Sequence, residues 1–257
     1  LLGFSVVVDV ALAPIGLLAA VAAPDRGVLP VLAVLPLIGL LGVLGREREQ
    51  RIRHTLELSD AYRGTALLMG ELLVADDQYT GGEHTSGVVT LALEVGKQLG
   101  LNPHEQRNLE FGALLHDVGK IRVPDAIINK PGKLSAEEWE IIKRHPADGQ
   151  EMLDRIGGVL GEVGLVVRGH HERWDGGGYP DGLAGEDIPL AARIICASDA
   201  FSAMTTNRSY RPAMDLPAAM EELRSCSGTQ FDPRVVDAIV RLIGERGSTP
   251  MLRLVAA

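Results

Sequence analysis

Seven imidazole and carboxylate groups in this chain have the residue types and positions that could build a metal centre. Four of them form two adjacent doublets, His116-Asp117 and His170-His171, and each doublet follows an apolar run typical of a buried helix. Asp199 lies within another apolar run, where a carboxylate is costly to bury without a partner. The full set is His84, His116, Asp117, His145, His170, His171 and Asp199. We predict that these groups share one site, although a histidine taken alone is more often a surface or core residue.

The donor types narrow the chemistry of that site. Imidazole and carboxylate ligands without a thiolate suit iron, manganese or a hydrolytic zinc ion better than a structural zinc cluster. Seven donors are more than one ion needs, so two metal ions bridged by an aspartate are the natural arrangement. We expect two divalent metal ions as cofactors, with iron or manganese favoured.

Helices must position these groups, because the pattern from Asp76 onward is helical throughout. A helix over 84–99 is predicted to stop at Gly100, and Pro103 starts the next helix, which runs to His116-Asp117. Further helices are predicted from a capping box at 135–138 and over 158–171, 189–206, 215–226 and 232–243. No alternating run has the length of a strand, and two loops stand out at 129–134 and 175–185. The predicted fold class is all-α.

The overall composition limits the partners and the compartment. The formal net charge of -9 does not indicate binding of a nucleic-acid polymer, and an anionic substrate would need local cations or metal ions. The two cysteines, Cys196 and Cys226, form neither a disulfide framework nor a zinc signature, which fits a reducing compartment.

Residues 1–45 are strongly apolar and carry only three charged side chains. Residues 28–45 have none, and as a helix they would span about 27 Å, close to the thickness of a hydrocarbon core. We predict two transmembrane helices joined by a turn at 24–27; a signal peptide with an anchor, or two buried core helices, are the alternatives. Four arginines between Arg46 and Arg53 favour a cytoplasmic side for the C-terminal segment. The expected location is the cell membrane, multi-pass and in contact with membrane lipid, with the catalytic domain in the cytoplasm.

A helical linker is predicted at 46–75. Apolar or small residues recur there at steps of four and three from Ile52 to Leu73, a heptad-like spacing of about three repeats. This spacing favours a helix that pairs with a second copy in a homodimer, or a single amphipathic helix that packs on its own domain. The expected domains are a transmembrane hairpin at 1–45, this linker, and a catalytic domain at 76–257.

Several motifs in the last segment resemble the HD-GYP subgroup of the HD-domain metal-dependent phosphohydrolases. Residues 116–121 read HDVGKI and match the HDxGK core of the family, and 170–180 read HHERWDGGGYP, which includes the Gly-Tyr-Pro that names the subgroup. Further matches, in the family's order, lie at 77–85, 128–134, 143–146, 192–194, 199–205 and 208–211. The resemblance covers about 76–243. One departure is that three residues separate Thr80 from His84, where the family has two.

The resemblance implies a helical HD-domain bundle with cyclic di-GMP phosphodiesterase activity. All seven donors named above become metal ligands, with Asp117 as the bridging and catalytic carboxylate. Lys120 is expected to contact the scissile phosphate and to take part in catalysis. Arg208 and Arg211 are expected to hold the second phosphate or to stack on guanine, and Tyr179 to cover a nucleobase.

The expected reaction is hydrolysis of cyclic di-GMP to pGpG, with a further step to GMP left open. A hydroxide that bridges the two metal ions would attack the phosphate, whose negative charge the ions neutralise. Thr80 stands where relatives with a third metal carry a glutamate, which favours two ions. Two alternatives remain: a non-hydrolysing, membrane-tethered protein that binds cyclic di-GMP or a protein partner, and an HD phosphohydrolase for another nucleotide.

Overall fold

The computed structural model describes residues 39–55, 57, 61, 64–65, 82–207 and 212–247. The chain divides into two compact units, Leu1–Tyr62 and Arg63–Ala257.

The described part of the first unit is helical and consists of residues 39–55, 57 and 61. It is apolar only up to Gly45 and is charged from Arg46 onward, with an ion pair of 2.8 Å between Arg51 and Glu47 one turn apart. Its course over 46–55 agrees with the predicted linker helix; the pairing of that helix with a second copy stays a prediction.

The predicted membrane location needs correction. Among the residues that the structure describes, no helix combines the length and the apolar character needed to cross a membrane. Within the described helix, residues 39–45 are apolar and charged residues follow from Arg46 onward. The remaining residues of the two predicted spans, 1–38, lie outside the described ranges. The prediction of a multi-pass cell-membrane protein in contact with lipid is therefore contradicted by this finding.

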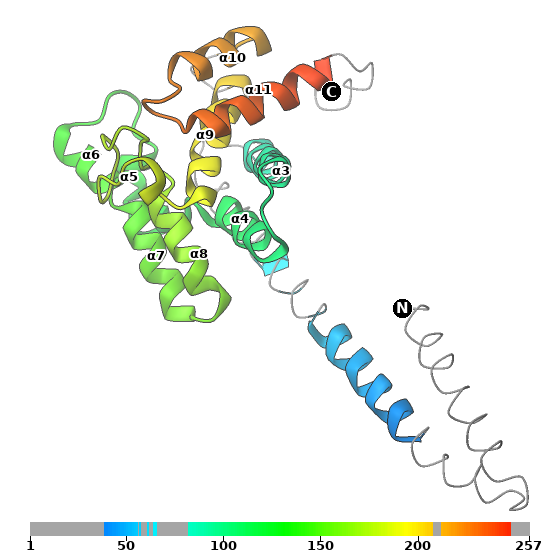
Figure 1. Ribbon diagram of the computed structural model, residues 1–257. Coiled ribbons are helices and arrows are strands. Elements are labelled where there is room, and N and C mark those ends of the chain that lie inside the picture. The colour runs from blue at the N-terminus through cyan, green and yellow to red at the C-terminus, as the bar shows by residue number, and fades with distance from the viewer. Residues whose placement is uncertain are drawn as a thin grey trace, which may run out of the picture. The chain divides into compact units, whose positions relative to one another are not determined.

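The second unit is built from helices, and the described residues contain no strand (Figure 1). The prediction of an all-α fold is thus confirmed. In chain order the elements are α3 (Gly82–Gln98), α4 (Pro103–Leu115), η1 (Val118–Arg122), α5 (Asp125–Ile128), α6 (Ala136–Ile142), α7 (His145–Ile156), α8 (Val159–Gly169), η2 (Gly185–Asp187), α9 (Leu190–Thr205), α10 (Leu216–Ser225) and α11 (Pro233–Gly247).

The local sequence explains where these helices begin and end. Helix α3 is followed by Gly100, whose φ of 81° lies in the left-handed region that glycine adopts without strain. Helix α4 starts with a capping box in which the Asn102 side chain accepts from the Glu105 backbone N–H and the Glu105 carboxylate accepts from the Asn102 backbone N–H. The capping box predicted at Ser135 is also present: Ser135 and Glu138 make the same reciprocal bonds at the start of α6.

Helix α9 runs through the main core and packs against α3, α4, α8, α10 and α11. Its side chains Ile194, Ile195 and Phe201 are buried in that core. A smaller second cluster packs the ends of α4 and α8 against α7, and it consists of Phe111, Leu114, Leu115, Val118, Leu153, Val163 and Val167. The apolar residues that precede both doublets therefore anchor the helix ends from which those doublets emerge.

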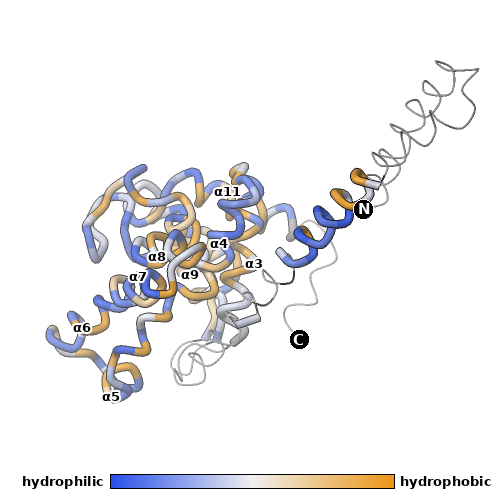
Figure 2. Tube along the Cα trace, turned by 90° about the horizontal axis from the view of Figure 1, so that it is seen from below, coloured by the Kyte–Doolittle hydropathy of each residue, from blue (hydrophilic) through white to orange (hydrophobic). Residues whose placement is uncertain are grey.

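The segment 125–142, called here the α5–α6 arm, differs from the rest of the unit because neither of its helices has a buried residue. Figure 2 shows α5 and α6 at one end of the unit, set off from the bundle. An ion pair of 2.6 Å between Lys130 and Glu138 fixes the loop after α5 onto α6.

Candidate metal centre

Helix ends bring five of the predicted donors to one place. His116 is the C-terminal cap of α4, with Asp117 beside it, and His170 caps α8, with His171 beside it. His145 is the first residue of α7. The side chains of His116, His145 and His170 are almost completely buried. Asp199 reaches this group from the middle of α9, and its Oδ1 lies 4.0 Å from His116 Nε2.

Three of the histidines are oriented by the same hydrogen bond. Nδ1 of His116 lies 2.8 Å from the Ala113 carbonyl, Nδ1 of His145 lies 2.8 Å from the Ile142 carbonyl, and Nδ1 of His170 lies 2.6 Å from the Val167 carbonyl. A carbonyl oxygen can only accept, so each Nδ1 carries the proton and donates it. In a neutral imidazole this leaves Nε2 with its lone pair, which is the form that binds a metal ion.

The Nε2 atoms converge on one another and on Asp117. His145 Nε2 lies 3.3 Å from His170 Nε2, and these two atoms with a ring nitrogen of His171 all lie within 4.8 Å of one another. The two carboxylate oxygens of Asp117 lie 3.4 Å from His145 Nε2 and 3.5 Å from His116 Nε2. Two lone pairs that face each other at 3.3 Å cannot form a hydrogen bond, whereas a cation that both nitrogens bind satisfies both lone pairs. The donor set therefore fits a metal ion.

Burial of the histidines and the charge of Lys120 together favour the protonation state that metal binding requires. Burial lowers the pKa of His145, and it lowers that of His170 well below the usual value; for His171 it lowers the pKa to about 4. Burial acts in the opposite direction on Asp117, but the nearby Lys120 ammonium holds the pKa of that carboxyl well below its usual value. His145, His170 and His171 are therefore neutral and Asp117 is ionised at neutral pH.

Lys120 binds the aspartate of the cluster. Its ammonium donates to Asp117 Oδ2 at 2.8 Å, and Lys120 follows Asp117 within the short helix η1. Gly119, between them in sequence, packs backbone to backbone on the first turn of α7. The contact predicted between Lys120 and a substrate phosphate stays a prediction.

Three predicted site residues cannot be placed with the others. His84 lies in α3, but its side chain falls outside the described part of the structure. Arg208 and Arg211 lie in 208–211, which is also outside the described ranges. Their roles as ligand and as substrate contacts stay predictions, and so does the effect of the additional residue before His84.

Hydrogen bonds to Glu172, which directly follows His171, hold the glycine-rich loop 175–185 next to the cluster. This buried carboxylate accepts the backbone N–H of Asp181 at 2.7 Å and that of Leu183 at 3.1 Å. A role for Glu172 was not predicted from the sequence, although a charged residue directly after a ligand doublet was a signal for one. Tyr179, which was predicted to cover a nucleobase, stacks on His171 with ring centroids 4.9 Å apart and an angle of 29° between the rings. Burial raises the pKa of Tyr179, so its hydroxyl stays protonated.

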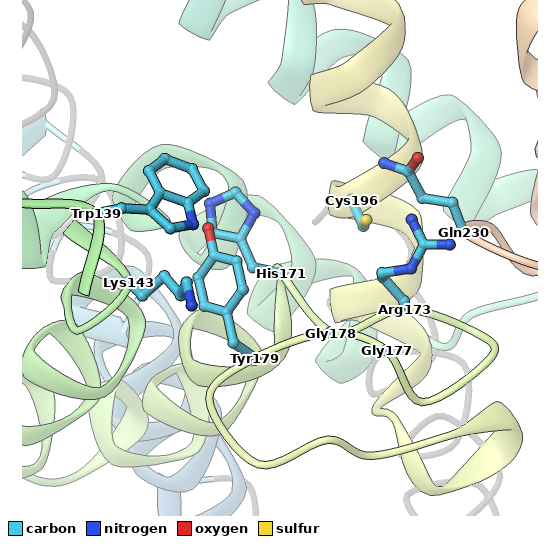
Figure 3. Close-up of a pocket in the computed structure, with 9 residues that line it drawn as sticks. All are labelled: Trp139, Lys143, His171, Arg173, Gly177, Gly178, Tyr179, Cys196 and Gln230. Carbon is cyan, nitrogen blue, oxygen red and sulfur yellow. The ribbon is translucent and has the colours of Figure 1, made fainter. Parts of the chain in front are cut away.

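A pocket of about 400 Å³ opens beside the cluster and shares His171 with it (Figure 3). It is lined by Trp139, Lys143, His171, Arg173, Gly177, Gly178, Tyr179, Cys196 and Gln230. Figure 3 shows Trp139 and Lys143 from the α5–α6 side and Cys196, Arg173 and Gln230 on the opposite side, with the loop that carries Tyr179 between them. The contributions of Trp139 and Gln230 were not predicted, since these residues come from segments far from the doublets in sequence.

The chain matches the HD domain family over residues 69–235, which is more than half of its length. The chain belongs to the HD-domain family. The resemblance predicted from the HDxGK and Gly-Tyr-Pro motifs is thereby confirmed.

Among curated HD-domain relatives, the cyclic di-GMP phosphodiesterase response regulator RpfG of Xanthomonas campestris pv. campestris is 41% identical over 199 residues, covering 76% of this chain and 48% of that protein. A cyclic di-GMP phosphodiesterase of Thermotoga maritima is 39% identical over 160 residues, covering 62% and 44%. The 3'3'-cGAMP-specific phosphodiesterase 1 of Vibrio cholerae is 40% identical over 179 residues, covering 68% and 41%. The chain thus spans less than half the length of each of these relatives.

Among solved structures, the cyclic GMP-AMP specific phosphodiesterase V-cGAP3 of V. cholerae superposes with a TM-score of 0.54 at 22% identity, covering 70% of this chain and 48% of that one. At this identity the likeness supports the HD-domain fold alone.

Proposed function

We propose that this HD-domain chain is a metal-dependent phosphodiesterase that opens cyclic di-GMP to linear pGpG. The observation that carries the proposal is the convergence of Asp117 with the Nε2 atoms of His116, His145 and His170. The names of the Xanthomonas and Thermotoga relatives support the substrate. Hydrolysis adds one water across a P–O3′ bond, so the ring opens and a 5′-phosphate remains on the linear product.

The residues that would hold metal ions are the five clustered donors together with Asp199 and His84. When bound, two divalent cations such as iron or manganese would withdraw charge from the phosphate and lower the pKa of a water molecule. The chain itself supplies neutral imidazoles fixed by backbone carbonyls and an ionised Asp117. Lys120 neutralises part of the Asp117 charge and adds a cation at the edge of the cluster, where an anionic substrate approaches.

A second substrate has support in the same family. Relatives of similar identity in V. cholerae are named 3'3'-cGAMP-specific phosphodiesterases. Both cyclic dinucleotides carry two phosphodiesters and at least one guanine, so the same cluster could act on either. The two substrates are therefore compared in the same assay.

The test is a turnover assay on the full chain, loaded without oxygen with iron(II) or manganese(II). Cyclic di-GMP and 3'3'-cGAMP are followed by chromatography, and metal per chain is measured by mass spectrometry. We expect linear product with metal, none with a chelator, and a loss of more than about 100-fold in Asp117→Ala. Asp237→Ala, an exposed aspartate on α11, is the matched control and should keep full activity. Binding of both nucleotides without hydrolysis under either metal would refute the enzyme and favour the receptor alternative.

A further inference from the structure

Trp139 is a large aromatic residue whose side chain belongs to neither of the two hydrophobic core clusters. It lies on α6 with 45% of its surface exposed, and the α5–α6 arm that carries it has no buried residue in either helix. Burying an aromatic side chain contributes strongly to a core, so a half-exposed tryptophan on a segment outside the core calls for another explanation. Helix α6 is held by its capping box and by the Lys130–Glu138 ion pair, and neither involves the indole.

The indole of Trp139 lines the pocket beside the metal centre, so its exposed surface includes a face that points into this pocket (Figure 3). The pocket has two other rings in its lining, His171 and Tyr179, and these are already stacked on each other. Trp139 makes no ring contact with another aromatic residue within the described part of the chain. A volume of about 400 Å³ falls within the range of about 300–1,000 Å³ that is typical of small-molecule sites.

We infer that Trp139 stacks on a nucleobase of the cyclic dinucleotide and makes α6 one wall of a substrate subsite. This inference rests on the proposed function and specifies where one half of the substrate lies. Every base has a flat π face, so an exposed indole binds purines by stacking regardless of their hydrogen-bonding edges. Lys143 lies one turn further along the same helical segment and lines the same pocket. Its ammonium pairs with Glu140 and, at the pocket wall, also suits the phosphate next to a stacked base.

The arm also couples this subsite to the metal centre. The carbonyl of Ile142, the last residue of α6, accepts the Nδ1–H of His145 at 2.8 Å. The helix that presents Trp139 therefore also orients one of the clustered imidazoles. A base held by Trp139 would lie at a fixed position relative to the cluster, as efficient attack on a phosphate requires.

The first test compares Trp139→Ala, Trp139→Phe and Ile141→Ala in the turnover assay. Ile141 is a half-exposed residue on the same helix that does not line the pocket, so its variant controls for damage to α6. We expect Trp139→Ala to raise KM by about 10- to 100-fold for both cyclic dinucleotides, with a much smaller change in kcat. Trp139→Phe should recover part of the loss, and Ile141→Ala should match the parent chain.

A second readout does not depend on turnover. The chain has two tryptophans, so stacking on Trp139 should quench a large part of the emission when cyclic di-GMP is added to the Asp117→Ala variant. The same titration should give little quenching when Trp139→Phe is combined with it, since Trp174 alone then remains. Active enzyme with an unchanged KM in Trp139→Ala overturns the inference but leaves the proposed function standing. If the parent chain is inactive but still shows Trp139-dependent quenching, the inference stands and the proposed function is overturned. A change in oligomer mass with neither effect would assign Trp139 to a protein interface and also overturn it.

Discussion

The substitution Gly119→Ala tests whether the metal centre depends on backbone contact between η1 and α7. A Cβ atom built at position 119 would lie 1.9 Å from the carbonyl oxygen of His145 and 2.6 Å from the backbone N of Gly149. Real Cβ contacts are essentially never closer than 3.0 Å, so η1 or α7 must shift by about 1 Å. Both clashing atoms belong to the backbone, and no side-chain rotation can relieve the overlap.

The shift has two measurable consequences. Overpacking costs about 1–3 kcal/mol where side chains can adjust, and a backbone clash should reach the upper end of that range or exceed it. For a chain of this size, about 3 kcal/mol lowers Tm by roughly 6–12 °C. The same movement separates Asp117, just before η1, from His145 at the start of α7. A displacement of about 1 Å in a catalytic group can cost about 100-fold in rate, so activity should fall by a similar factor.

Thermal melting followed by circular dichroism, together with the turnover assay, checks both effects. Gly244→Ala is the matched control, because Gly244 is exposed on α11 and its added Cβ would have no other atom within 4 Å. Alanine is more favourable than glycine in a helix by up to about 1 kcal/mol, so that variant should melt at the same temperature or slightly higher. If Gly119→Ala melted within about 2 °C of the parent chain and kept its activity, the close contact could not be what requires glycine.

Three further predictions concern other parts of the unit. Replacing Glu172 with glutamine should loosen the glycine-rich loop and cost about 1–3 kcal/mol, seen as faster hydrogen exchange in 175–185; unchanged exchange there would contradict it. Asp232→Ala should cost about 3–5 kcal/mol in denaturant unfolding, because it leaves the buried Arg193 without its carboxylate at 2.7 Å, and a loss below about 1 kcal/mol would refute this. As the pH falls from about 7 to about 5, the metal-free chain should become less stable, because histidines in the unfolded chain bind protons that the buried His170 and His171 do not. Equal free energies of unfolding at both pH values would contradict the pKa shifts.

The clustering of the two doublets was predictable because two independent signals coincide at them. Apolar runs before His116 and His170 predict buried helix ends, and donors at such ends need partners. The sequence could not give the contacts that depend on how distant segments pack. The pairing of Lys120 with Asp117, the loop contacts of Glu172 and the place of Trp139 in the pocket follow from three-dimensional arrangement, and no periodicity encodes them.

The prediction of a membrane location, which the described residues contradict, rested on hydropathy alone. The hydropathy of residues 28–45 measures how apolar that segment is, but it does not determine where the helix that contains the segment begins and ends. In the structure, residues 39–45 continue directly into the charged segment 46–55 within one helix. The described residues contain no helix that is both long enough and apolar enough to cross a membrane.

One feature of helix geometry accounts for both the position and the chemistry of the cluster. The last four carbonyls of a helix have no partner within it, and Ala113, Ile142 and Val167 all lie in the last turn of their helices. Each of these carbonyls accepts the Nδ1–H of a histidine three residues later, which fixes the tautomer and directs Nε2 toward Asp117 or another imidazole. In the middle of a helix the same carbonyl would be bonded to a backbone N–H, and the imidazole would lose its orienting partner. The location of His116, His145 and His170 within three residues of a helix end is therefore a condition for the role as metal ligands that we propose for them.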